Sequence, residues 1–181
     1  MTIIIGIDPG SRITGYGVIR VEGNHSIRLA SGSIKVNTLL PAERLQKIHS
    51  ELQQIIQLYQ PHEAAIEQVF MHENPGSALK LGQARGAAIV ALTIPVSEYS
   101  ARQVKQSVVG YGAAKKEQVQ HMVGRILNLT EILQADEADA LAIALCHAHS
   151  RLSLISRLAS SQGVVKKGRS KRTSWRDYKP D

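Results

Sequence analysis

The first apolar run of the chain is short and rich in β-branched residues. Residues 3–7 contain four isoleucines and are followed directly by Asp8, which is typical of a buried strand that ends in a turn. Residues 14–21 and 27–36 each alternate loosely between apolar and polar positions, and Glu22-Gly23-Asn24 between them is a hairpin signal. The three segments predict an antiparallel meander at the start of a sheet.

Beyond residue 40 the pattern alternates between helices and strands. Helical spacing of apolar residues and short apolar runs predict a helix over 41–59, a strand over 64–67, a helix from 74 to about 92, a strand over 95–99, helices over 101–108 and 115–127, and a buried helix from 136 to about 150. Strand–helix–strand units imply parallel neighbouring strands with right-handed crossovers. We therefore expect an α/β fold with a mixed five-stranded sheet and helices on both faces.

Length and charge indicate one folded domain followed by a tail. A chain of 181 residues, 43% of them hydrophobic, suits a single core. The net charge of +7 comes entirely from residues 151–181, which hold nine Lys or Arg against two Asp. We expect a folded domain over 1–150 and a flexible basic arm over 151–181 that contacts DNA. A tail that only keeps the protein soluble is the alternative.

The sequence contains no pattern that indicates secretion or a membrane. A charged segment followed by a signal-type apolar run is missing, and no apolar stretch approaches the ~20 residues that a bilayer requires. Cys146 is the only cysteine, which excludes an intrachain disulfide and a cysteine zinc site. These features favour a soluble cytoplasmic protein.

Four acidic residues occupy positions that the predicted sheet would bring to one edge. Asp8 and Glu67 each end a hydrophobic strand. Asp136 and Asp139 are three residues apart at the start of the last helix, so they share a face. Each has an ordinary explanation, because the helix pair could be a cap, Asp8 could open a turn, and Glu67 could pair with an Arg.

Gathered together, these acids would need a cation. Two carboxylates about 4 Å apart repel by roughly 4 kcal/mol at an effective dielectric constant near 20. Oxygen-only ligands suit Mg²⁺ or Mn²⁺. A pair of such ions promotes in-line attack of water on a phosphodiester, since one ion activates the water and the other stabilises the leaving 3′ oxygen. The acids therefore predict a site for two Mg²⁺ ions, with Mn²⁺ as a substitute.

Several motifs resemble those of a known family. They are residues 5–17 (IGIDPGSRITGYG), 65–70 (AIEQVF), 101–105 (ARQVK), 118–123 (QVQHMV) and 136–144 (DEADALAIA). In this order, over about residues 1–150, they resemble the RuvC family of bacterial Holliday-junction resolvases, whose fold is RNase H-like and belongs to the retroviral integrase superfamily. The tail lies outside the resemblance.

The resemblance implies an endodeoxyribonuclease whose metal ligands are Asp8, Glu67, Asp136 and Asp139. Family members are homodimers that bind four-way DNA junctions and nick two strands of like polarity symmetrically, leaving 5′-phosphate ends, in recombination and repair. They act with a junction-binding protein and a hexameric branch-migration motor, RuvA and RuvB.

Three further residues gain a role from the resemblance. Lys105 and Lys116 match basic positions that approach the scissile phosphate, and Phe70 matches an aromatic that stacks on an unpaired base. Without the resemblance, the lysines would be read as solvated helix residues and Phe70 as part of the core. Ala78, Gly82 and Gly86 recur every four residues and form a smooth stripe. This stripe could pack on the sheet or form a dimer seam, and the resemblance favours the seam.

Three other classes of protein share some of these features. An ATP-binding fold of the actin and sugar-kinase kind opens with a similar loop, but it repeats its unit twice, for which 181 residues are too few. A small RNA-processing nuclease could have the same fold. A non-enzymatic DNA-binding module could use the basic tail, but the intact set of acids argues against it.

Overall fold

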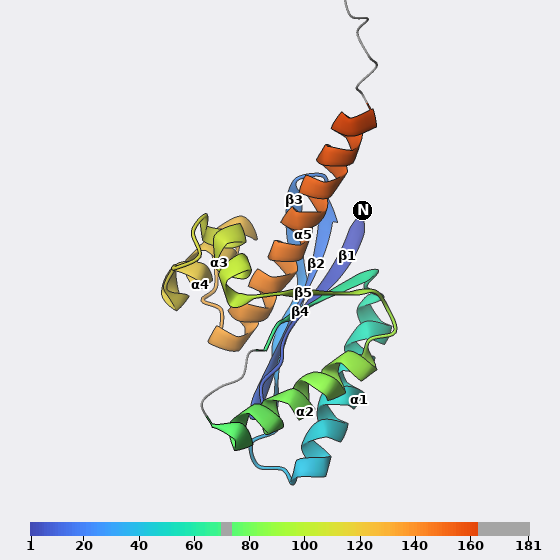
Figure 1. The fold of residues 1–181 in the computed structure, drawn as a ribbon, viewed down its shortest axis with the longest axis vertical. Coiled ribbons are helices and arrows are strands. Elements are labelled where there is room, and N and C mark those ends of the chain that lie inside the picture. The colour runs from blue at the N-terminus through green and yellow to red at the C-terminus, as the bar shows by residue number, and fades with distance from the viewer. Residues whose placement is uncertain (70–73, 163–181) are drawn as a thin grey trace, which may run out of the picture. The chain divides into compact units, whose positions relative to one another are not determined.

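The computed structural model describes residues 1–69 and 74–162 (Figure 1). Within these ranges the elements are β1 (Thr2–Asp8), β2 (Ile13–Glu22), β3 (His25–Lys35), α1 (Pro41–Tyr59), β4 (Glu63–Glu67), α2 (Pro75–Ala91), β5 (Val96–Tyr99), α3 (Ala101–Val109), α4 (Lys116–Ile126) and α5 (Ala135–Gln162). Met1–Ser150 form one compact unit, which contains the whole sheet. No helix in the described ranges combines the length and the apolar character needed to cross a membrane.

The sheet has the strand order β3-β2-β1-β4-β5. β1 pairs antiparallel with β2, and β2 with β3, whereas the β1–β4 and β4–β5 pairs are parallel. This confirms the predicted mixed five-stranded sheet of an RNase H-like α/β fold. Because β1 and β4 are parallel neighbours with Ile7 opposite Ile66, the acids that follow these residues, Asp8 and Glu67, lie at the same edge.

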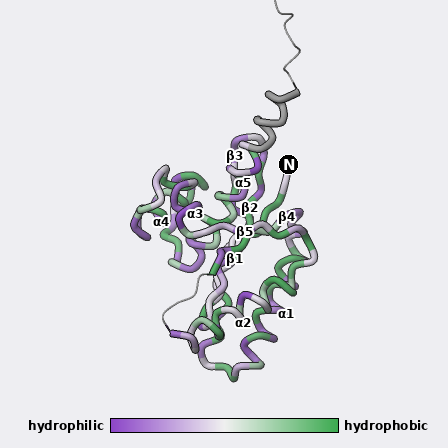
Figure 2. The backbone as a smooth tube through the Cα atoms, viewed as in Figure 1, coloured by the Kyte–Doolittle hydropathy of each residue, from purple (hydrophilic) through white to green (hydrophobic). Residues whose placement is uncertain are grey.

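Helices cover both faces of the sheet (Figure 1). On one face, Ile5 and Ile7 of β1 belong to a core that includes α1 and α2. On the other face, Ile4 belongs to a core built with α3, α4 and α5. In Figure 2, α1 alternates between hydrophilic and hydrophobic stretches, as expected for a helix with one face on the sheet. The period-two alternation of β1 thus divides the isoleucines between two cores.

Glycines in β1 and β2 allow α5 to lie directly on the sheet. A β-carbon added at Gly6 would collide with the helix backbone at Ala140, and one added at Gly15 would collide with the backbone at Asp136. Only glycine permits this approach without moving the helix. The close packing sets the start of α5 against β2 at Gly15, the residue paired with Asp8.

The last helix differs from its predicted form at both ends. It begins at Ala135, so Asp136 lies inside the first turn and is not the capping residue. It also runs to Gln162 and does not end near Ser150. The sequence supplies the reason, because no Gly or Pro interrupts the chain between Ala135 and position 163. The predicted division into a domain over 1–150 and a basic tail stays a prediction.

His147 has a structural role that its sequence pattern did not indicate. The residue is 8% exposed. One ring nitrogen lies 2.7 Å from a carboxylate oxygen of Glu63, and the other lies 2.8 Å from the hydroxyl of Tyr99. These contacts tie α5 to β4 and β5.

Candidate active site

Asp8 and Glu67 share a hydrogen bond at the carboxyl ends of β1 and β4. Burial raises the pKa of Asp8 to about 8, and the negative charges of Glu67 and Asp139 contribute to the rise. Burial also raises the pKa of Glu67, while the hydrogen bond from Asp8 lowers it. In the metal-free protein the Asp8–Glu67 pair therefore retains a proton to a higher pH than an exposed carboxyl would, and that proton lies in their shared hydrogen bond.

Asp139 approaches the same edge from the first turns of α5, where it meets Lys116. The Lys116 Nζ lies 2.6 Å from the Asp139 Oδ2. This hydrogen bond raises the pKa of Lys116, and the negative charges of Asp139, Asp136 and Asp8 raise it further. A cationic nitrogen thus offsets part of the repulsion among the acids.

Asp136 is the fourth predicted acid. Its charge acts on Lys116, and its backbone packs over Gly15 beside β1. It is partly exposed, like Asp139. The described structure therefore brings Asp8, Glu67 and Asp139 into one electrostatic group, with Asp136 at its border.

A cavity of about 210 Å³ opens beside the acids. Glu67, Lys105, Lys116 and Asp139 contribute its charged lining. Its remaining walls are apolar and come from α3, α4 and α5: Ala101, Val104, Val119, Ala142 and Ile143. Both predicted lysines therefore face the same space as two of the predicted acids. This arrangement can hold an anionic group between the lysines, next to the carboxylates.

The chemistry of this donor set fits a hard divalent cation. All the candidate ligands are carboxylate oxygens, the donors preferred by Mg²⁺ and Mn²⁺. Across the described part of the chain, no three His, Cys, Asp or Glu side chains form a ready-made metal cluster as they lie. Two of the acids hold each other, and Asp139 holds Lys116. An ion bound here would compete with the proton that Asp8 and Glu67 share and with Lys116 for the oxygens of Asp139.

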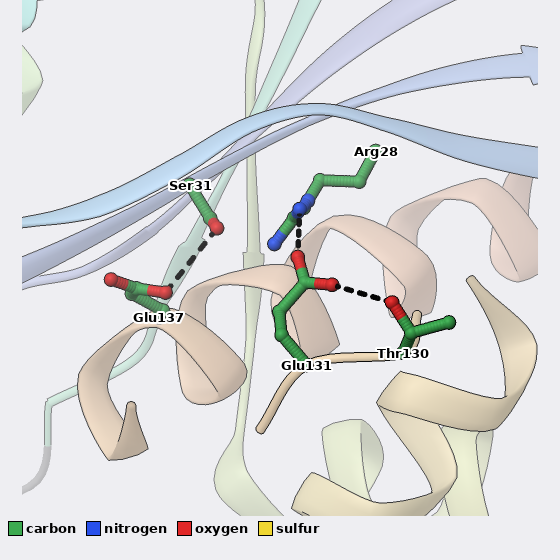
Figure 3. Close-up of polar contacts among 5 residues, drawn as sticks. All are labelled: Arg28, Ser31, Thr130, Glu131 and Glu137. Carbon is green, nitrogen blue, oxygen red and sulfur yellow. Dashed lines mark hydrogen bonds and ion pairs between the residues drawn. The ribbon is translucent and has the colours of Figure 1, made fainter. Parts of the chain in front are cut away.

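Contacts from β3 fasten the segment that leads into α5 (Figure 3). Arg28 donates a hydrogen bond to Glu131 in the loop before the helix. The Ser31 hydroxyl lies 3.4 Å from an oxygen of Glu137, which neighbours Asp136. This support extends the glycine-mediated packing and orients the first turn of α5.

The predicted stripe on α2 faces away from the sheet. A β-carbon added at Gly82 or Gly86 would meet nothing within 4 Å. The sheet-facing side of the helix is instead formed by buried alanines, Ala84, Ala88 and Ala91. Leu79 and Val90 are 65% and 72% exposed. Gly82 and Gly86 therefore lie on the side of α2 that is turned away from the sheet.

Phe70, the predicted base-stacking residue, lies outside the described residues.

Two arginines make contacts in this region that the sequence analysis did not predict. The guanidinium of Arg44 donates hydrogen bonds to carbonyls at Leu39, Asn37 and Ser11, joining two loops at the acidic edge. Arg85 donates to the carbonyl oxygen of Glu67.

The strand order and the position of the acids define an RNase H-like nuclease class, and comparison with known proteins identifies the family within it. The family model described as Crossover junction endodeoxyribonuclease RuvC matches residues 4–147. The chain therefore belongs to the RuvC family of crossover junction endodeoxyribonucleases.

Individual relatives support this assignment. The chain is 57% identical to Crossover junction endodeoxyribonuclease RuvC of Idiomarina loihiensis over 174 residues, covering 92% of this chain and 98% of that protein. It is 60% identical to the Marinobacter nauticus protein of the same description, covering 93% and 98%. Among solved structures, Thermus thermophilus RuvC in complex with Holliday junction substrate aligns with a TM-score of 0.80 at 36% identity, covering 84% of this chain and 96% of that one.

Proposed function

We propose that this protein is a Holliday-junction resolvase that nicks two strands of like polarity symmetrically in four-way DNA junctions. One observation carries the proposal: in a chain of the RuvC family, three acids and two lysines converge at one sheet edge. Such a site suits hydrolysis of a phosphodiester, because the acids can hold cations and the lysines can hold the phosphate. The products would carry 5′-phosphate ends, and the reaction would serve recombination and repair.

Asp8, Glu67, Asp139 and Asp136 would hold two Mg²⁺ ions, with Mn²⁺ as a substitute. When bound, the ions would supply an activated water and a positive charge at the leaving 3′ oxygen. The proton on Asp8 must be released before its carboxylate can act as a ligand, since a protonated carboxyl is a poor donor to a hard cation. The metal-dependent step should therefore become more favourable as the pH rises toward and above 8.

Lys105 and Lys116 would bind the scissile phosphate. Both line the cavity beside Glu67 and Asp139. Once Asp139 turns toward an ion, Lys116 would be free to donate hydrogen bonds to a phosphate oxygen. Phe70, three residues beyond Glu67 in the sequence, would stack on a base at the junction.

The enzyme would act as a homodimer that joins through α2. Resolution requires two cuts related by two-fold symmetry, and each chain offers one acidic edge. The outward stripe at Gly82 and Gly86, flanked by exposed Leu79 and Val90, permits close approach of a second copy. A groove lined by residues of α1 and α2, including Gly86 and Val90, adjoins this stripe.

Further partners follow from the family and from the charge. The substrate would be four-way junction DNA, delivered with a RuvA-type junction-binding protein and a RuvB-type hexameric motor in the cytoplasm. Residues 151–181, which carry the whole net charge, would add contacts to DNA phosphates.

Cleavage of a synthetic four-way junction tests the proposal. We expect Mg²⁺-dependent nicks at symmetric positions on two strands of like polarity, with ligatable ends. Linear duplex of the same sequence and a structured RNA serve as controls. Preferential cutting of the RNA would make the protein an RNA-processing nuclease, and efficient cutting in EDTA would exclude the metal-dependent mechanism.

A further inference from the structure

We propose that Arg85 is a positioning residue that holds the end of β4 and thereby sets the Glu67 carboxylate for metal binding. This inference rests on the proposed function of the acidic edge. It concerns a residue on α2, an element that contributes none of the four acids.

The Arg85 guanidinium connects two neighbouring strands. Its Nε donates a hydrogen bond of 3.4 Å to the main-chain carbonyl oxygen of Glu67, the last residue of β4. Its Nη2 lies 2.7 Å from the Oε2 of Glu98 in β5. The Arg85 side chain is 22% exposed, whereas that of Glu98 is 45% exposed, so the ion pair lies at the protein surface. A planar guanidinium can serve two acceptors at once with fixed geometry.

The contact falls at the point where β4 loses its pairing with β1 but keeps its pairing with β5. The β1–β4 pairing ends with Ile7 opposite Ile66, one residue before Glu67. On the other side, the Gln68 amide still donates to the Tyr99 carbonyl at 2.8 Å. The Glu67 main chain is thus held by β5 on one side and by Arg85 through its carbonyl. Both bonds are made by the peptide unit between Glu67 and Gln68, so Arg85 and Tyr99 together limit its rotation and with it the positions that the Glu67 carboxylate can take.

The Glu98 ion pair keeps the guanidinium in place. Partly exposed ion pairs add little to global stability. Here the ion pair acts on orientation, because Glu98 fixes the plane of the Arg85 guanidinium whose Nε reaches the Glu67 carbonyl. Removing a residue that hydrogen-bonds to a metal ligand and orients it typically lowers metal affinity or activity by about 10–100-fold. Arg85 contacts the backbone and not the carboxylate itself, so we expect a change of about 10-fold, at the lower end of that range.

The experiment compares Arg85→Ala, Arg85→Lys and Glu98→Gln with the wild type. Two readouts need no DNA cleavage: Mn²⁺ affinity from the electron paramagnetic resonance of free Mn²⁺, and amide hydrogen exchange at Gln68. A third readout is the Mg²⁺ concentration that half-saturates single-turnover cleavage of a junction. Arg20→Ala is the matched control. It removes an ion pair of 3.0 Å between Arg20 and Glu22 in β2, a strand that carries neither Asp8 nor Glu67.

Arg85→Ala should weaken Mn²⁺ binding by about 10-fold, accelerate exchange at Gln68 and raise the half-saturating Mg²⁺ by a similar factor. Arg85→Lys should resemble Arg85→Ala, since one ammonium group cannot reproduce the fork, and Glu98→Gln should show a smaller change in the same direction. Unchanged Mn²⁺ affinity and exchange in Arg85→Lys would overturn the inference, even if Arg85→Ala failed to fold. Failure of the wild type to cut junctions would instead refute the proposed function, while the Mn²⁺ and exchange readouts would still judge Arg85.

Discussion

Replacement of Asp8 by Asn should stabilise the metal-free protein at neutral pH. In the folded wild type, burial and two neighbouring carboxylates disfavour the ionised form of Asp8. The asparagine side chain has nearly the same shape and no charge. Its amide can donate to the Glu67 carboxylate, as the protonated acid does in the wild type. The substitution therefore removes an electrostatic cost while keeping the hydrogen bond.

The pKa of Asp8 gives the magnitude. It is about 8 in the folded chain against an ordinary value of 3.8. Because the folded-state pKa is the higher one, the stabilisation is complete below pH 3.8 and is lost as the pH rises toward 8. The loss is about 1.4 kcal/mol for each pH unit in this window, or ~4 kcal/mol between pH 5 and 8. The advantage of Asp8→Asn over the wild type should grow by that amount across the same range.

Urea unfolding in EDTA at pH 5, 6, 7 and 8 measures this difference. Glu51→Gln is the control, because Glu51 is partly exposed in an ion pair with Lys47 and its removal should give a small shift that is constant over this range. Adding Mg²⁺ at pH 8 should stabilise the wild type through binding to the folded state. The asparagine variant should gain less.

Parallel stability curves for the wild type and Asp8→Asn between pH 5 and 8 would refute the argument. They would mean that Asp8 is not buried among carboxylates in the metal-free protein. Equal stabilisation of both proteins by Mg²⁺ would remove Asp8 from the proposed ligand set.

Four other outcomes are expected. Glu67→Gln should reduce cleavage at least 100-fold while junction binding in Ca²⁺, measured by gel shift, stays within about two-fold, because binding depends mainly on phosphate contacts. Gly86→Leu should weaken dimerisation in sedimentation experiments without unfolding the chain, since that position has open space around it. Gly15→Ala should cost about 2–3 kcal/mol in thermal unfolding by pushing the Asp136 backbone off the sheet. Deleting residues 163–181, which leaves α5 intact, should make junction binding less dependent on salt. The slope of log binding constant against log salt concentration should become shallower by about 0.9 for each DNA phosphate that these residues neutralise in the full-length protein.

The fold could be predicted because its signals are local and repeated. A β-branched run defines β1, a hairpin signal joins β2 to β3, and the apolar spacing over residues 41–59 matches α1 at both ends. The predicted end of α5 was wrong because a helix continues where nothing stops it, and a fall in apolar content at Ser150 is not a stop signal.

The acids could be predicted for a related reason. Asp8 and Glu67 each end a strand, and parallel neighbouring strands place such ends together. Asp136 and Asp139 lie near the start of α5 and are three residues apart, so they share a helix face. Residues that act across elements have no such signal. Arg85 and His147 lie within helices, and their partners are 13 to 84 positions away in sequence. Only the packed chain shows that a guanidinium reaches a carbonyl on another element, or that an imidazole bridges two strands.

The close packing of α5 on the sheet brings the carboxylates together, which costs stability but also gathers the oxygen donors that the proposed metal site needs. Gly6 and Gly15 let α5 lie close to the sheet, so that Asp139 in its second turn acts electrostatically on Asp8. A bulkier residue at either glycine would lift the helix, separate the carboxylates and lower their mutual repulsion. It would also spread the donors that a cation needs. A cation bound in the proposed site would offset this repulsion, because it would bring positive charge between the carboxylates. Glycine at positions 6 and 15 therefore keeps the carboxylates at the spacing that such a cation would need, and the folded protein without a cation bears the cost of their repulsion.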